Sequence, residues 1–269
     1  MEDSPPSISV LMCVCNEEAW VSQAIESILR QTYSDFELLI TDDGSSDNTY
    51  DISQNYGSDA RVRILRHSRG EGLAASLNEQ ICRSRGRYIA RMDGDDVADP
   101  ERFTKQISFL DTHPRVGLLG SCCREIDKDG NPVAIWQRPL TNNSLQRALL
   151  RYNPFIHSTV LLRHEVFSIA GLYDQSLRYA QDYELWLRVA KYYELANLPE
   201  PLVDLRVDWS KLAQKNKEAR RFEFQILIRH FKNESYPKKY YIYLLRPFLL
   251  SIMPTAWMMK LKTIQRRLR

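Results

Sequence analysis

The sequence predicts an α/β protein whose central sheet is mostly parallel. Two observations support this: strand-like and helix-like segments alternate over about the first hundred residues, and the strand-like segments are continuous apolar runs. Alternation of this kind implies right-handed βαβ units, and continuous apolar runs are typical of strands covered on both faces. With 269 residues, the chain is long enough for one large domain or for one domain with an appendage.

The first part of the chain shows the alternation most regularly. Residues 7–14 form an apolar, β-branched run and are expected to be a strand. Residues 17–31 carry apolar side chains every three or four positions, which predicts a helix. Further strands are expected at 36–41, 62–66 and 87–92, and further helices at 47–55 and 71–83.

Beyond residue 100 the pattern is less regular. A hairpin is expected over 125–136, because Asp129-Gly130 favours a tight turn. The other expected elements are helices at 100–113, 145–151 and 182–191, a strand at 116–120, and an extended segment at 158–162. No internal repeat or low-complexity segment is evident.

Charge divides the chain into an acidic body, residues 1–209, and a basic tail, residues 210–269. The tail holds 15 Lys and Arg residues against three Glu and no Asp, a net charge of +12, which leaves −9 for the body. A helix is expected over 211–233, followed by a segment rich in aromatic and aliphatic residues. Arg246, Pro247 and Pro254 interrupt that segment and argue against a transmembrane span.

Residues 236–269 are therefore expected to form an interfacial segment on an anionic membrane surface, because basic residues flank the apolar ones. The alternative is a helical hairpin that packs on the body or on a second subunit. Nucleic acid is not an expected partner, since the Leu, Ile, Met and Trp content of the tail suits lipid better.

Cysteine usage and the N-terminus favour a cytoplasmic protein. The five cysteines are odd in number and include no CxxC pair, so neither a zinc site nor a disulfide framework is expected. The first six residues, Met-Glu-Asp-Ser-Pro-Pro, lack the basic start and apolar core of a signal peptide. Together with the tail, this predicts a peripheral protein at the inner face of the cell membrane.

Polar clusters follow four of the expected strands, where the carboxyl ends of parallel strands meet and where such sheets bind ligands. They are Asn16-Glu17-Glu18, Asp42-Asp43 with the residues up to Thr49, the segment 66–72, and Asp93-Gly94-Asp95-Asp96. Each cluster alone is explained as well by a turn or a helix cap. Four clusters on one edge favour a ligand site.

The last cluster places three carboxylates within four residues. Like charges this close repel, and burying them unpaired is costly. A hard divalent cation, Mg²⁺ or Mn²⁺, relieves that cost because it prefers oxygen ligands. The cluster therefore suggests a metal site beside a nucleotide diphosphate, with an acidic capping turn as the alternative.

Several motifs occur in a consistent order along the chain. They are the segments 9–18, 31–37, 41–49, 93–96, 154–160, 171–174 and 181–188. With them the chain resembles the family-2 glycosyltransferases of bacterial polysaccharide and lipid-linked glycan synthesis, over roughly residues 7–200. The resemblance implies the GT-A fold, a Rossmann-like nucleotide-diphospho-sugar transferase fold, with a nucleotide-binding half at about 7–100 and an acceptor half at about 101–209. It does not cover the basic helical tail.

The resemblance also implies roles for individual residues. Asp182 is the catalytic base of an inverting transfer, and Asp95 is a ligand to Mn²⁺ or Mg²⁺. The expected donor-binding residues are Asn16 and Glu17 in the nucleotide pocket, Asp43 on the base, Asp93 on the ribose or sugar, Asn78 beside the donor, and Arg91 paired with Asp93 or a phosphate. His157 is expected on the metal or a phosphate, with a backbone-satisfied polar residue as the alternative. Asp96 has no assigned role.

The expected function is transfer of a hexosyl or N-acetylhexosaminyl group from a nucleotide sugar to a hydroxyl of a glycan or lipid-linked glycan. The expected donor is a UDP-sugar. Cys15 stands where the family often has an aromatic residue against the base. One alternative is a sugar nucleotidyltransferase, which usually has a Gly-rich basic loop where this chain has Asn16-Glu17-Glu18. The other is a non-catalytic, membrane-bound glycan-assembly protein, which the presence of Asp182 and the acidic turn disfavours.

Overall fold

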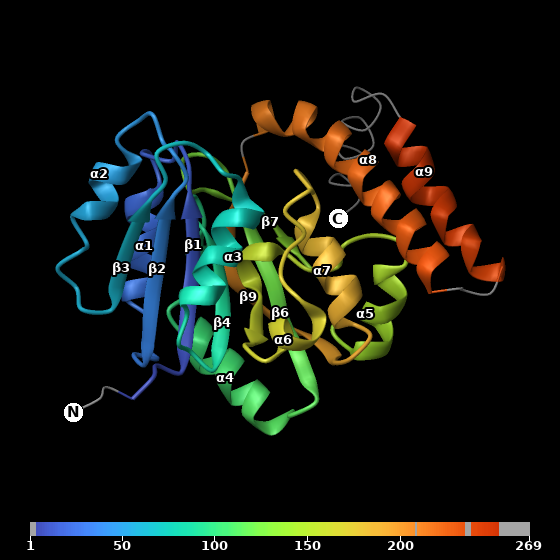
Figure 1. The fold of residues 1–269 in the computed structure, drawn as a ribbon, viewed down its shortest axis with the longest axis horizontal. Coiled ribbons are helices and arrows are strands. Elements are labelled where there is room, and N and C mark those ends of the chain that lie inside the picture. The colour runs from blue at the N-terminus through green and yellow to red at the C-terminus, as the bar shows by residue number, and fades with distance from the viewer. Residues whose placement is uncertain (1–3, 208, 235–237, 253–269) are drawn as a thin grey trace.

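A computed structural model describes residues 4–207, 209–234 and 238–252 of the chain. A central sheet lies between two layers of helices (Figure 1). The strands are β1 (Ile8–Val14), β2 (Phe36–Asp42), β3 (Val62–Arg66), β4 (Tyr88–Asp93), β5 (Val97–Ala98), β6 (Val116–Ile126), β7 (Pro132–Trp136), β8 (Leu161–Arg163) and β9 (Glu194–Arg206). Their order in the sheet is β3-β2-β1-β4-β8-β6-β9-β5, and β7 pairs with β6 outside this order. The predicted α/β class is confirmed.

The helices of the body connect these strands. They are α1 (Val21–Leu29), α2 (Thr49–Gln54), α3 (Leu73–Arg83), α4 (Arg102–Thr112), α5 (Asn142–Leu149), the 3₁₀ turn η1 (His157–Thr159), α6 (Val166–Ala170) and α7 (Gln181–Val189).

The N-terminal half is parallel, as predicted. β1 pairs with β2 and β4, and β2 pairs with β3, all in the parallel sense. Both β1 and β2 are buried along their whole length. Alternate residues of β1 enter two separate cores: Val10 and Met12 face α1 and α4, whereas Leu11 faces α3 and α7.

The second half is mixed, and the sequence predicts it less well. β8 runs antiparallel to β4 and β6, whereas β6 and β9 are parallel to each other. The expected extended segment at 158–162 is wrong in its first part, because residues 157–159 form a 3₁₀ turn. The hairpin of β6 and β7 forms as predicted.

The long strand β9 was not predicted, because two prolines interrupt its pattern. Ser121 of β6 pairs with Leu198 while Cys122 pairs with Pro201, so Pro199 and Glu200 form a bulge. Proline lacks the N–H that a strand interior donates, and the bulge removes that need. β9 ends at Arg206, beside the turn that follows β4.

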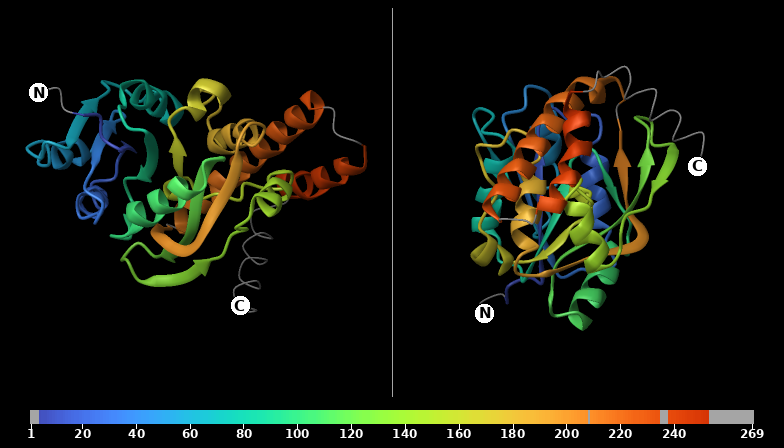
Figure 2. Two further views of the ribbon diagram at one scale, coloured as in Figure 1. Left: turned by 90° about the horizontal axis from the view of Figure 1, so that it is seen from below. Right: turned by 90° about the vertical axis from the view of Figure 1, so that its right-hand side faces the viewer.

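Two C-terminal helices, α8 (Trp209–Asn233) and α9 (Leu245–Ile252), form a pair at the end of the molecule far from the N-terminus (Figure 2). The 3₁₀ segment η2 (Lys238–Leu244) leads into α9. α8 is seated on the body through Ile226, Leu227 and Phe231, which are buried in the core shared with α7. No helix within the described residues is long and apolar enough to cross a membrane. The rest of the predicted interfacial segment, 236–237 and 253–269, lies outside the described residues.

Candidate active site

The expected clusters meet at one edge of the sheet. Val14 of β1 pairs with Asp42, and Cys13 pairs with Asp93, so the three strands end at the same level. β1 runs upward in Figure 1, so this edge is at the top, near the first turns of α8. The site is therefore built from the residues that directly follow β1, β2 and β4.

Asp43 organises the loop that follows β3. Its Oδ1 accepts the Glu71 N–H, and its Oδ2 accepts the Gly72 N–H, both at 2.9 Å. His67 bridges two carboxylates, with Nδ1 at 2.8 Å from Asp43 and Nε2 at 2.7 Å from Glu79. Burial alone would lower the pKa of His67, but its hydrogen bonds to both carboxylates raise the pKa above the ordinary value. Both oxygens of Asp43 are thus engaged within the protein, and its role on the donor base stays a prediction.

Asn16 and Glu17 shape the end of β1. Asn16 has a left-handed φ of 56°, which asparagine tolerates, and its Oδ1 accepts the Ser46 N–H at 2.9 Å. Glu17 lies against the acidic turn so closely that a Cβ on Gly94 would come within 2.0 Å of Glu17 Oε2. That oxygen is buried and has no hydrogen-bond partner in the described part of the chain. Burial and the charges of Asp95 and Asp93 raise the pKa of Glu17 to about 9.

Asp93, Asp95 and Asp96 offer one oxygen each within 4.8 Å of one another. Asp93 is ion-paired with the buried Arg91 and accepts a hydrogen bond from Ser158 Oγ at 2.8 Å. Burial would raise the pKa of Asp93, but the Arg91 charge and hydrogen bond hold it low.

Asp96 is the buried member of the cluster. Its Oδ1 accepts the Arg206 N–H at 2.8 Å, and its buried Oδ2 has no partner among the described residues. Burial and the charges of Asp93 and Asp95 raise the pKa of Asp96 well above its ordinary value. Three close carboxylates, together with the unsatisfied buried oxygens of Asp96 and Glu17, fit a divalent cation, because a cation would remove both the repulsion and the missing contacts.

Arg206 is a site residue that the sequence did not reveal. Its Nε donates to the main-chain oxygen of Asp95 at 2.8 Å, and its Nη2 donates to Gln23 Oε1 at 2.7 Å. Its Nη1 donates to the main-chain oxygens of Asp127 and Lys128, at 3.2 and 3.1 Å. One side chain thereby ties the acidic turn to α1 and to the β6–β7 hairpin. The only available signal was the strand β9 itself, which the prolines concealed.

Asp182 lies in the first turn of α7. Its Oδ2 accepts a hydrogen bond from Asn153 Nδ2 at 2.7 Å. Burial raises the pKa of Asp182, while hydrogen bonds from the Tyr183 N–H and Asn153 oppose the rise. A carboxylate with a raised pKa and a fixed orientation is suited to accept a proton.

His157 and Asn78 both meet Tyr173. His157 Nε2 lies 2.9 Å from the Tyr173 hydroxyl, and burial together with the Arg91 charge lowers the pKa of His157 well below its usual value. The Asn78 amide donates to the Tyr173 main-chain oxygen and accepts the Tyr173 N–H, both at 2.9 Å. Its surroundings therefore favour the neutral form of His157, which is not one of the three residues of the aspartate cluster. A role for His157 on a metal and for Asn78 on the donor stays a prediction.

Comparison with known proteins gives a family match. The model of "Glycosyl transferase family 2" matches residues 9–168. An uncharacterized glycosyltransferase of Haemophilus influenzae is 32% identical over 212 residues, which are 75% of this chain and 66% of that protein. The putative glycosyltransferase EpsE of Bacillus subtilis is 30% identical over 261 residues, 95% of this chain and 93% of that protein.

Solved structures resemble the fold at low sequence identity. Residues 1–349 of S. aureus TarS in complex with UDP-GlcNAc superimpose with a TM-score of 0.65 at 18% identity, over 82% of this chain and 66% of that one. The mannosyltransferase PcManGT of Pyrobaculum calidifontis in complex with GDP-Man and Mn²⁺ gives a TM-score of 0.67 at 16% identity, over 95% and 72%. These likenesses confirm the GT-A fold that the sequence led us to expect.

Proposed function

Because the chain belongs to glycosyl transferase family 2, we propose that it is an inverting, divalent-metal-dependent glycosyltransferase that moves a sugar from a nucleotide sugar to a hydroxyl of a glycan or lipid-linked glycan. The observation that supports this best is the three-aspartate cluster beside Glu17 and Arg91, at the sheet edge where nucleotides bind. In this proposal residues 1–209 are the catalytic body and residues 210–269 an appendage.

The roles of the residues follow from their surroundings. Asp95, with Asp93 and Asp96, would hold the cation, which when bound neutralises charge on the leaving diphosphate. The acceptor oxygen attacks the anomeric carbon of the sugar while the bond from that carbon to the diphosphate oxygen breaks. Asp182 takes the proton of the acceptor hydroxyl. A single displacement of this kind inverts the anomeric configuration and needs no second carboxylate as nucleophile.

We propose a UDP-sugar as the donor, with transfer of a hexosyl or N-acetylhexosaminyl group. The support is indirect: TarS is described with UDP-GlcNAc, and PcManGT with GDP-Man. Cys15 is exposed at the end of β1 and offers no aromatic face to the base, so a GDP-sugar is the competing donor.

A thermal-shift screen of nucleotide sugars with and without Mn²⁺ tests the proposal. We expect one UDP-sugar to raise the melting temperature only when Mn²⁺ is present, because a ligand stabilises the folded state that it binds. Stabilisation by nucleoside triphosphates but by no nucleotide sugar would favour a nucleotidyltransferase and overturn the proposal.

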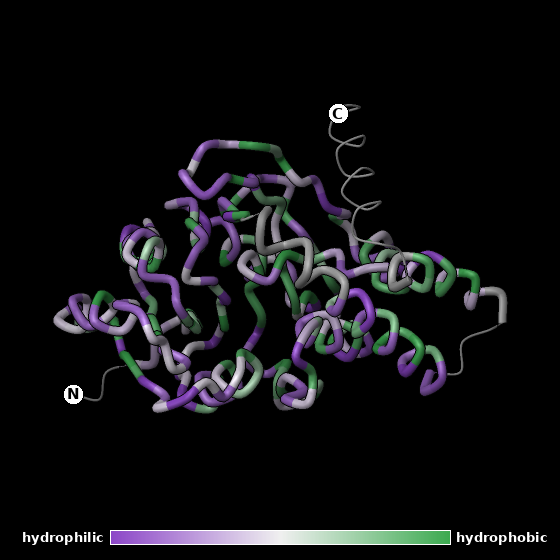
Figure 3. The backbone as a smooth tube through the Cα atoms, turned by 90° about the horizontal axis from the view of Figure 1, so that it is seen from above, coloured by the Kyte–Doolittle hydropathy of each residue, from purple (hydrophilic) through white to green (hydrophobic). Residues whose placement is uncertain are grey.

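We also propose that the C-terminal helices meet an anionic membrane surface. Tyr241, Ile242, Leu245, Phe248 and Leu249 are all more than 40% exposed, at spacings that fit one side of η2 and α9. Figure 3 shows hydrophobic residues along both helices of the pair. The +12 charge of the tail supplies the attraction to anionic lipid. Such a protein would act at the inner face of the membrane, where lipid-linked acceptors are accessible.

Vesicle co-sedimentation of the full chain tests this attachment. The wild type should sediment with vesicles that contain phosphatidylglycerol and less with phosphatidylcholine alone. Ile242→Asp with Leu245→Asp should stay largely in the supernatant, because both changes place charge on the apolar face. Ile169→Asp is the matched control, since Ile169 is equally apolar and exposed but lies on α6. Equal sedimentation of all three proteins would refute the attachment.

A further inference from the structure

Arg220 on α8 is a buried cation without a hydrogen-bond partner. Its residue surface is 7% exposed, and Nε, Nη1 and Nη2 are all buried with no hydrogen bond to any described residue. Burial lowers the pKa of Arg220, and the charge of Glu223 opposes that shift. A buried guanidinium whose donors make no hydrogen bond is costly, and an anion that accepts from those donors would remove the cost.

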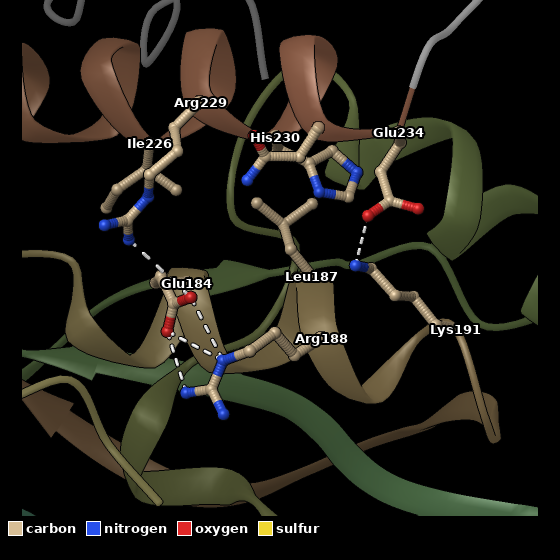
Figure 4. Close-up of a pocket in the computed structure, with 9 residues that line it drawn as sticks. Glu184, Leu187, Arg188, Lys191, Ile226, Arg229, His230 and Glu234 are labelled. Atoms are coloured by element: carbon tan, nitrogen blue, oxygen red, sulfur yellow. Dashed lines mark hydrogen bonds and ion pairs between the residues drawn. The ribbon is translucent and has the colours of Figure 1, made fainter. Parts of the chain in front are cut away.

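α8 is held against α7, which carries Asp182. Figure 4 shows the contact between them: Arg229 reaches Glu184 at 3.7 Å, and Lys191 is paired with Glu234. The buried side chains of Ile226 and Leu227 fix the same contact from the apolar side. The position of α8 relative to α7 is therefore defined by the fold.

The part of α8 that carries Arg220 lies beside Asp182. The ring of Phe222 meets Tyr179 edge-on, with centroids 5.7 Å apart, three residues before Asp182. Glu223 is close enough to Asp182 that burial and the Asp182 charge raise the pKa of Glu223 to about 7, while Arg246 and Arg220 oppose the rise. Arg246 lies over the ring of Tyr152, next to the Asn153 that binds Asp182. These contacts place α8 and the start of α9 next to the segments that hold Asp182.

We propose that Arg220 binds an anionic group, a phosphate or a carboxylate, of the acceptor substrate. The inference rests on the proposed glycosyl transfer. A guanidinium offers a planar pair of donors that matches either anion. The acceptor is favoured over the donor because the cluster assigned to the donor diphosphate follows β1 and β4, whereas Arg220 belongs to the helix beside the proposed base. A phosphate would come from a lipid-linked acceptor, and a carboxylate from an acidic sugar.

The test measures binding of two small anions to the full chain, with and without saturating UDP and Mg²⁺. The probes are phenyl phosphate and glucuronic acid, followed by saturation-transfer NMR. We expect the UDP-loaded wild type to bind at least one probe and Arg220→Gln to bind it about tenfold or more weakly. The matched control is Arg221→Gln, which removes the same charge from an exposed neighbour and should bind like the wild type. Preference for phenyl phosphate assigns a phosphate-bearing acceptor, and preference for glucuronic acid an acidic sugar.

Three results would overturn the inference: no binding of either probe, equal binding by wild type and Arg220→Gln, or an equal loss in Arg221→Gln. Arg220→Lys serves as a second variant if Arg220→Gln melts early, and it should bind with intermediate affinity because it keeps the charge without the planar fork. UDP binding is measured in the same samples. If the chain binds UDP but its binding of the probes does not depend on Arg220, this inference alone is overturned. A chain that binds no nucleotide overturns the proposed function instead.

Discussion

Asp95→Asn is expected to lose Mn²⁺ binding and to lower transfer activity by about 10²–10³-fold or more. The substitution keeps the size of the side chain but removes the charge of one of the three carboxyl groups whose oxygens lie within 4.8 Å of one another. The remaining carboxylates attract a cation less strongly, and charge on the leaving diphosphate is then neutralised less well. Electron paramagnetic resonance of free Mn²⁺ measures the affinity independently of turnover.

Two further variants make this test specific. Asp129→Asn removes a charge from the exposed β6–β7 turn, where Asp129 pairs with Lys128, and should leave Mn²⁺ affinity unchanged. Arg206→Gln should weaken Mn²⁺ binding to an intermediate degree. The change removes the side-chain hydrogen bond to the Asp95 main chain, whereas the main-chain N–H of residue 206 still donates to Asp96. Unchanged Mn²⁺ affinity in Asp95→Asn would exclude Asp95 as a ligand.

The nucleotide-binding half could be predicted because its signals are local. β1, β2 and β4 are largely apolar runs followed by acidic residues, and each run lies within a short window of sequence. Since parallel strands end at one edge, the acids that follow them are brought together by topology alone. The grouping of Glu17 with Asp93 and Asp95 follows from this rule, and in the structure Glu17 lies against Gly94 of the same turn, where the charges of Asp95 and Asp93 raise its pKa.

The parts that escaped prediction depend on partners far away in the chain. Arg206 reaches Asp95 across 111 residues, and Asn153 reaches Asp182 across 29. Neither side chain carries a pattern of its own that marks it as a site residue. β9 was missed for a different reason, because Pro199 and Pro201 are tolerated only through a bulge against β6 that the sequence of β9 alone does not reveal.

Some of the predicted site residues also hold main-chain groups in place, which a sequence motif does not show. The oxygens of Asp43 hold the 67–72 loop, and the amide of Asn78 holds the main chain of Tyr173. Substitution of either residue would therefore disturb a loop as well as any donor contact. For this reason the decisive variants are Asp95→Asn and Asp182→Asn, which remove the charge on which the proposed role depends and keep the shape of the side chain.

Asp182→Asn is expected to lower kcat by about 10²–10⁴-fold while UDP-sugar binding is retained. The amide has nearly the same shape, and its oxygen can still accept the hydrogen bond from Asn153, but it cannot take up the acceptor proton. Steady-state kinetics combined with thermal shift separates the two effects. Asp174→Asn, in the loop before α7, is the control. Its kcat should stay near that of the wild type, because the Asp174 carboxylate is bonded to Ser176 and paired with Arg229 and has no role in the proposed proton transfer. A kcat within about tenfold of wild type for Asp182→Asn would contradict the assignment.

The pH profile gives a second, independent check on Asp182. Burial raises the pKa of this carboxyl, and the active form of a base is the ionised one, so the rate should fall as the pH drops through that raised pKa. The Asn153 hydrogen bond lowers the pKa of Asp182, because it stabilises the carboxylate. Asn153→Ala should therefore shift the acid limb of kcat to higher pH, and Asp182→Asn should abolish that limb. A limb that does not move in Asn153→Ala would mean that another group governs proton transfer, because Asn153 contacts Asp182 directly and any base at this position must feel its loss.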